Sequence, residues 1–214
     1  MTTNLTYAGA RDLLDKLADD VIGAKDELTT LDAALGDGDL GRTVERGFRA
    51  IKESLTAEAG DSDLGMLFFK AGKTFSDAAA SSFGALLGTA FMKGGMALKG
   101  KAEASPADII EAMQTALNAL MERGKANVGD KTMLDALHPA IEAMRAYLAQ
   151  NEASPELGAC LRAGADAAQE GAVRTQTMQS QIGRASWQGE RSVGHMDPGA
   201  RAVAIMLDSV ARHV

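Results

Sequence analysis

Apolar residues recur at helical spacing along most of the chain, and this periodicity constrains the fold more than any other feature. Within residues 44–55 the spacings are four, three and four, which places one apolar stripe on a helix face, formed by Val44, Phe48, Ile51 and Leu55. Residues 64–75 repeat the pattern. No segment shows the alternation of β-branched residues expected of a strand. The sequence therefore predicts an all-α fold.

Helix boundaries are marked by capping residues and glycines. A capping residue precedes a proline at Ser105-Pro106, Ser154-Pro155 and Asp197-Pro198, and each pair predicts a helix start. Helical patterns also cover residues 6–35, with a break near Gly23, and residues 85–98 and 131–150. The total is about eight helices. Glycine-rich stretches at 36–41, 81–88, 124–129 and 183–199 are predicted to be loops between them, and loops at one end of a bundle can converge on a ligand.

Composition narrows the range of functions. Hydrophobic residues make up 46% of the 214 residues but aromatic ones only 4%, which favours an aliphatic helical core. We expect one domain over residues 1–214. The net charge of −7 argues against nucleic acid or an anionic membrane as a partner. With a single cysteine, no signal peptide and no apolar run near the roughly 20 residues of a membrane span, we expect a cytoplasmic protein.

The stretch Gly36-Asp37-Gly38-Asp39-Leu40-Gly41 matches the dinucleotide pattern G-x-G-x-x-G, but it follows a helical segment rather than a strand. A Walker A match at 95–101 lacks the hydroxyl residue because Ala102 follows it, and an EF-hand fails because Phe48 stands where the bidentate Glu belongs. Asp32, Asp37 and Asp39 remain as three carboxylates within eight residues. Their clustering favours a hard cation such as Mg²⁺, and a plain aspartate–glycine turn stays open as the alternative.

Four longer segments carry a family resemblance. In chain order they are GDGDLGRTVERGF at 36–48, SSFGALLGTAF at 81–91, GDKTMLDALHPA at 129–140 and GRASWQGERSVGHMDPGA at 183–200. Together they resemble the signature segments of the dihydroxyacetone kinase L-type domain. The resemblance implies a barrel of eight antiparallel helices whose loops at one end bind ADP or ATP through two Mg²⁺ ions. It also implies an apolar barrel interior that can hold a lipid-like molecule.

The resemblance assigns roles to individual residues. Asp32, Asp37 and Asp39 become the magnesium ligands, and no catalytic residue is assigned in this chain. The residues that the resemblance places near the nucleotide are Leu40, Gly41, Arg42, Thr43, Ser81, Ser82, Gly124, Met133, Arg184, Asp197, Pro198 and Gly199. Arg184 and the 197–199 turn match a closing segment over the nucleotide. Trp187 in that segment either stacks on a base or anchors the loop, and we favour anchoring.

Two positions depart from the family. The family commonly has His-Gly-Thr-Asn-Met after the third aspartate, where this chain has Leu40-Gly41-Arg42-Thr43-Val44, so the contact of that histidine is missing. Phe83 stands where a Ser or Thr often precedes the glycine. Both departures leave the nucleotide affinity and the phosphate donor open.

The resemblance also implies partners. In the family the ketose is held covalently by a histidine of a separate K-type subunit, and nothing in this chain resembles that subunit. The expected function is therefore the nucleotide-binding half of a dihydroxyacetone kinase or of a kinase for a related ketose such as erythrulose. Three alternatives stay open: a bound ADP rephosphorylated by a phosphohistidine protein of the phosphotransferase system, an exchangeable ATP, and a regulatory subunit that reports nucleotide state. A homodimer stays open too.

Overall fold

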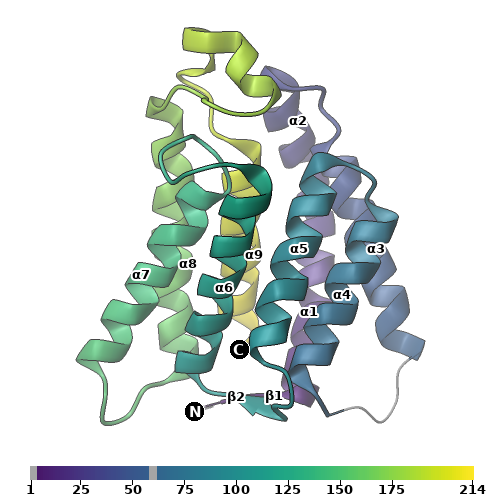
Figure 1. The fold of residues 1–214 in the computed structure, drawn as a ribbon, viewed down its shortest axis with the longest axis vertical. Helices are drawn as coiled ribbons and strands as arrows, with labels where there is room; N and C mark the ends of the chain where they lie inside the picture. Colours follow the sequence, from purple (N-terminus) through teal and green to yellow (C-terminus); the bar gives the residue numbers. More distant parts are fainter. Residues whose placement is uncertain (1–3, 58–61) are drawn as a thin grey trace.

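The computed structural model describes residues 4–57 and 62–214, which form nine α-helices and two short 3-10 helices (Figure 1). The α-helices are α1 (Tyr7–Gly23), α2 (Lys25–Leu35), α3 (Leu40–Ala57), α4 (Leu64–Ala78), α5 (Ser82–Ala97), α6 (Pro106–Gly124), α7 (Leu134–Gln150), α8 (Leu157–Arg174) and α9 (Pro198–His213). The 3-10 helices are η1 (Thr175–Thr177) and η2 (Arg184–Ser192). The all-α prediction is confirmed, and α1 and α2 are separated only by Ala24, next to the predicted break.

Eight of the helices form a closed ring. Each of α3 to α8 packs against the next helix along the chain, α1 packs against both α3 and α9, and α2 lies at one end against α3 and α9. Successive helices run up and down the bundle, so alternate helices begin at the same end (Figure 1). The structure therefore agrees with the barrel of antiparallel helices that the resemblance implied. No helix in the described part of the chain is long and apolar enough to cross a membrane.

The apolar stripe of α3 faces the middle of the ring. Val44, Phe48 and Ile51 are fully buried, and the Phe48 ring meets Phe75 of α4 edge to face at a centroid distance of 5.2 Å. Burial of such a stripe is the main source of stability for the helix, because most helical stability in proteins comes from packing of an apolar face and not from helix propensity. The periodicity in the sequence thus identified the core face of α3 correctly.

Two of the three predicted helix starts are confirmed. Ser105 and Asp108 form a reciprocal capping box at α6, and Asp197 accepts a hydrogen bond from Ala200 N at the start of α9. The third is wrong in register, because α8 begins at Leu157 after Glu156 rather than at Ser154. Both Ser154 and Pro155 lie in the preceding turn.

The glycine-rich stretch 81–88 is not the predicted loop, since all but its first residue belong to α5. Gly88 permits close packing against α4. A Cβ on Gly88 would lie 2.8 Å from the backbone oxygen of Gly72, and one on Gly72 would lie 2.6 Å from the backbone oxygen of Gly88. In this stretch, glycine reflects the short distance between two helices and not a turn.

A short antiparallel pair of strands joins the segment before α1 to the segment before α6, at the lower end of the bundle in Figure 1. Strand β1 (Leu5–Thr6) pairs with β2 (Glu103–Ala104), which immediately precedes α6. Strands of two residues are too short to produce alternation in the sequence, which explains why the pattern contains no sign of them.

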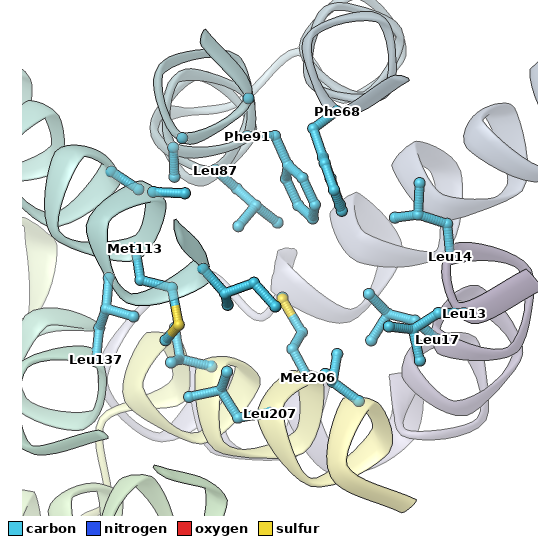
Figure 2. A pocket seen from close by; sticks show the side chains of 18 of the residues that line it. Leu13, Leu14, Leu17, Phe68, Leu87, Phe91, Met113, Leu137, Met206 and Leu207 are labelled. Carbon is cyan, nitrogen blue, oxygen red and sulfur yellow. The ribbon is translucent and has the colours of Figure 1, made fainter. Parts of the chain in front are cut away.

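The interior of the ring holds an apolar cavity of about 230 Å³ (Figure 2). Leucine, methionine and phenylalanine side chains from several helices point into it. Phe68 of α4 and Phe91 of α5 lie side by side in a stacked arrangement, and Met206 of α9 points in from the opposite side. The apolar interior implied by the resemblance is therefore present.

Candidate metal and nucleotide site

A second and more polar pocket, of about 520 Å³, lies at the end of the bundle away from the two strands. Four helices, α3, α5, α7 and α9, begin at its wall, through Leu40, Ser82, Leu134 and Pro198. Each helix N-terminus carries a partial positive charge, which favours an anion such as a phosphate. One first-turn amide at each already donates to a side-chain oxygen: Leu40 N to Asp32, Gly84 N to Ser81, Leu134 N to Thr132 and Ala200 N to Asp197. The up-and-down topology of the ring is what brings these four N-termini to one end.

Three carboxylates gather on one side of this pocket. Asp32 lies in the last turn of α2, and Asp37 and Asp39 lie in the loop that leads to α3. One oxygen from each lies within 4.8 Å of the other two, and no other such group of three possible metal ligands occurs in residues 4–57 and 62–214. Asp32 Oδ2 accepts hydrogen bonds from Asp39 N at 2.8 Å and Leu40 N at 3.1 Å. These bonds fix α2 and the start of α3 relative to each other.

Gly36 and Gly38, the two glycines of this loop, are favoured over other residues for different physical reasons. A Cβ on Gly36 would lie 2.6 Å from Asp32 Oδ1, so a side chain there would displace the carboxylate. Gly38 has a φ of 70°, a left-handed conformation that other residues adopt at a cost. Both allow the loop to fold back over the end of α2 and bring the acids together.

The donor set fits Mg²⁺. Carboxylate oxygens are the protein ligands that Mg²⁺ prefers, and three of them so close together repel one another unless a cation lies between them. The guanidinium group of Arg184, which comes from η2, forms an ion pair with Asp37. A positively charged group thus already stands against the acidic cluster.

Nine of the residues predicted to bind nucleotide line this pocket together with the three aspartates: Leu40, Ser81, Ser82, Gly124, Met133, Arg184, Asp197, Pro198 and Gly199. Gly41, Arg42 and Thr43 are not among its lining residues. They form the first turn of α3, where Gly41 and Thr43 are buried and Arg42 is exposed. Their contact with a nucleotide stays a prediction.

Two of the lining residues have structural roles that the sequence left open. The Leu40 side chain is only 5% exposed and belongs to the core, so in place of the family histidine it offers no polar group. Ser81 caps α5, because its Oγ accepts a hydrogen bond from Gly84 N at 3.0 Å. Trp187 is 82% exposed, so the interpretation that it anchors the closing segment is wrong.

Asp197 is an acid of the pocket whose pKa is shifted strongly upward. Burial, with the nearby Asp135 adding to it, raises the pKa of Asp197 to about 7, against the opposing effects of its Ala200 N hydrogen bond and of Lys131. Asp135 in turn accepts hydrogen bonds from Gly129 N at 2.6 Å and Thr132 N at 2.7 Å, which hold the loop before α7. The sequence placed Asp135 and Lys131 in a family motif without a role, and only the fold reveals that they face Asp197.

This pKa makes the stability of the unliganded protein depend on pH. Because the folded state holds the Asp197 proton more tightly than the unfolded state, stability is lost as pH rises from about 4 to about 7. Asp197→Asn keeps a capping oxygen and removes the titration. Relative to wild type, we expect the variant to gain about 2 kcal/mol in the free energy of unfolding between pH 5 and pH 8, measured by urea denaturation. A difference that does not change with pH would contradict the assignment.

An eight-helix barrel with an acidic cluster beside a pocket bordered by four helix N-termini defines the structural class of this protein. The family model described as the DAK2 domain matches residues 34–212. The chain belongs to that family. It is 36% identical over 193 residues to the ADP-binding subunit DhaL of the PEP-dependent dihydroxyacetone kinase of Escherichia coli (strain K12), covering 90% of both chains.

Longer relatives contain a similar region. The chain is 35% identical to the D-erythrulose kinase of Mycolicibacterium smegmatis, covering 95% of this chain and 35% of that one. Among solved structures, the dihydroxyacetone kinase of C. freundii in complex with AMP-PNP and Mg²⁺ superposes with a TM-score of 0.73 at 30% identity, covering 94% of this chain and 33% of that one. The present chain thus spans about a third of these larger kinases and most of the E. coli subunit.

Proposed function

We propose that residues 1–214 form one L-type domain that acts as the nucleotide-binding subunit of a kinase for dihydroxyacetone or a related ketose. It carries Mg²⁺ with ADP or ATP and passes a phosphoryl group to a ketose held by a separate K-type subunit. The observation that carries this proposal is the cluster of Asp32, Asp37 and Asp39 beside a pocket bordered by four helix N-termini. Such a pair of features suits a metal–phosphate ligand, since one binds the cation and the other the anion.

The chemistry of phosphoryl transfer matches what these residues offer. The reaction depends on positioning and on neutralising charge more than on covalent chemistry by the protein. Asp32, Asp37 and Asp39 would hold the magnesium ions, which supply that neutralisation when bound. The N-termini of α3 and α5 lie in the pocket wall, where their partial positive charge would orient phosphate oxygens. Arg184 adds a positive charge beside the cluster through its ion pair with Asp37.

The pocket also has an apolar stretch of wall that suits a purine base. Leu120, Ala126 and Met133 are buried side chains that line the pocket next to Gly124. Adenine presents a flat apolar face of the kind that such a wall contacts. This arrangement supports the placement of the base near Gly124 and Met133.

The partners are part of the proposal. The E. coli relative and two from Listeria innocua are named as subunits of PEP-dependent kinases, which supports a K-type subunit and a phosphohistidine protein as partners here. The solved kinase of C. freundii in complex with AMP-PNP and Mg²⁺ supports an exchangeable ATP instead. The phosphate donor therefore has to be decided by experiment.

Small molecules released from the purified chain distinguish these cases. The chain is dialysed in Mg²⁺, denatured, and its supernatant analysed for nucleotides. Stoichiometric ADP that survives dialysis supports the phosphoprotein-dependent kinase, while an empty chain that binds and rapidly exchanges Mg-ATP supports the ATP-dependent one. If neither nucleotide binds even with Mg²⁺, the proposed kinase function is wrong and a regulatory role through partner contacts moves ahead of it.

A further inference from the structure

Lys131, in the loop between α6 and α7, is a buried lysine in an unfavourable backbone conformation. Its side chain is only 2% exposed, and its φ is 63°, a conformation that glycine adopts readily and other residues rarely do. Lysine is among the residue types least often buried, because its ammonium group must be paired or hydrogen-bonded away from water. The contacts of the ammonium group should therefore explain why lysine stands here.

The Lys131 ammonium group joins two points that are far apart in the chain. Its Nζ donates hydrogen bonds to Met178 O at 3.1 Å and to Ser192 O at 2.5 Å. These two residues bound the part of the closing segment that carries Arg184, residues 178–192, and from here on the name refers to this part alone. The segment contains η2 and lies at the top of the bundle in Figure 1. One buried cation thus holds both ends of the segment that carries Arg184.

Further hydrogen bonds join the two ends of the closing segment, at a place that we call the neck. Gly194 N donates to Gln176 O at 2.7 Å, and Ser180 N donates to Ser192 Oγ at 2.9 Å. Both Ser180 and Ser192 are buried, so the two ends of the segment pack closely against each other at the neck. Lys131 lies inside it, with the carboxylate of Asp197 near enough to attract its charge.

Beyond the neck the side chains of the closing segment are much more exposed. Trp187 is 82% exposed, and the ion pair between Arg184 and Asp37 joins two side chains that are 60% and 45% exposed. Exposed ion pairs contribute little to stability by themselves. The place of Arg184 above the acidic cluster therefore depends on the neck, and on Lys131 within it.

We propose that Lys131 is a positioning residue, whose ammonium group clamps the two ends of the closing segment and thereby holds Arg184 over the metal and nucleotide site. The inference that this serves nucleotide binding rests on the proposed function, whereas the clamp itself does not. The clamp acts in the unliganded protein, so a direct phosphate contact by Lys131 is not required.

Limited digestion with trypsin tests the clamp without any nucleotide. Arg184 and Arg191 are cleavage sites within the segment, and Trp187 is the only tryptophan of the chain, so its fluorescence anisotropy reports on this segment alone. Lys131→Met retains the length of the side chain and removes the ammonium group. We expect cleavage at Arg184 and Arg191 to accelerate at least about tenfold and the anisotropy to fall, because two hydrogen bonds to a charged donor are lost.

Matched variants keep the test specific. Lys125→Met changes an exposed lysine of the same loop that also has a positive φ, of 50°, and should digest like wild type. Lys131→Arg retains a cation with several donors and should restore most of the protection. Unchanged cleavage and anisotropy in Lys131→Met would overturn the proposal. So would a variant that does not fold, or one cut equally fast throughout the chain, because either would show that Lys131 supports the whole fold.

Measurement of the affinity for Mg-ADP tests whether the clamp matters for nucleotide binding. If wild type binds Mg-ADP, Lys131→Met should bind it at least about tenfold more weakly, in parallel with the faster cleavage, because Arg184 loses its place. Faster cleavage with unchanged affinity would overturn the functional half of the proposal. A wild-type chain that binds no Mg-ADP would instead refute the proposed function, and the digestion result would still decide whether Lys131 clamps the segment.

Discussion

Asp37→Asn is expected to lower the affinity for ADP in the presence of Mg²⁺ by at least about 100-fold, because even residues behind the metal ligands change metal affinity by 10–100-fold. Asp37 is the best of the three aspartates for this test. Asp32 also accepts two backbone hydrogen bonds, and its replacement would disturb the start of α3 as well as the metal site. Isothermal titration with ADP and Mg²⁺ measures the change.

The fold should survive this substitution. Asp37 is nearly half exposed, its ion pair with Arg184 is exposed, and loss of one carboxylate relieves repulsion within the cluster. We therefore expect the free energy of unfolding without Mg²⁺ to stay within about 1 kcal/mol of wild type. The matched control is Asp12→Asn, which changes an exposed carboxylate that is paired with Lys16 on α1, and it should leave ADP affinity unchanged. A large loss of unliganded stability in Asp37→Asn would point to a structural role for Asp37.

Gly41→Ala is expected to destabilise the protein by about 3 kcal/mol, the upper range for adding atoms to a packed interior. A Cβ at this position would lie 2.0 Å from Thr29 Oγ1 and 2.2 Å from the backbone oxygen of Lys25. The Thr29 side chain could rotate away, but the carbonyl belongs to the first turn of α2 and cannot move without shifting that helix. Urea denaturation without nucleotide measures the loss.

A matched glycine separates this steric effect from a general effect of alanine in helices. Gly23, at the end of α1, has open space where a Cβ would stand, with no neighbouring group within 4 Å, and Gly23→Ala should raise stability by about 0.5 kcal/mol. If Gly41→Ala is as stable as wild type, the close approach of α2 and α3 described here is wrong. In that case the placement of Asp39 next to Asp32 would also need revision.

The sequence predicted those parts of the fold that depend on local chemistry. The stripe on α3 and the cap at Ser105 reflect spacing and capping within one segment, and both are confirmed. The start of α8 was misplaced because Ser154-Pro155 satisfies the local rule for a cap while the chain continues its turn for two more residues. The glycine at 88 was misread because the close contact that requires it is with α4, a neighbouring helix, and not within its own segment.

The candidate site likewise has features that the local sequence predicted and features that it did not. Asp32, Asp37 and Asp39 lie within eight residues, so their clustering was visible in the sequence, and the structure brings their oxygens together. The roles of Lys131 and Trp187 were not visible. Lys131 bonds to carbonyl groups 47 and 61 residues away, and the exposure of Trp187 depends on how the closing segment is held. Contacts over such separations have no local pattern in sequence.

The affinity of the wild-type chain for ADP, measured by isothermal titration over a range of free Mg²⁺ concentrations and in EDTA, tests the central claim most directly. If the three aspartates hold the cations that bind the phosphates, affinity should rise with Mg²⁺ and should fall at least about 100-fold in EDTA, since bare carboxylates repel a diphosphate. Equal affinity for ADP with and without Mg²⁺ would contradict the account.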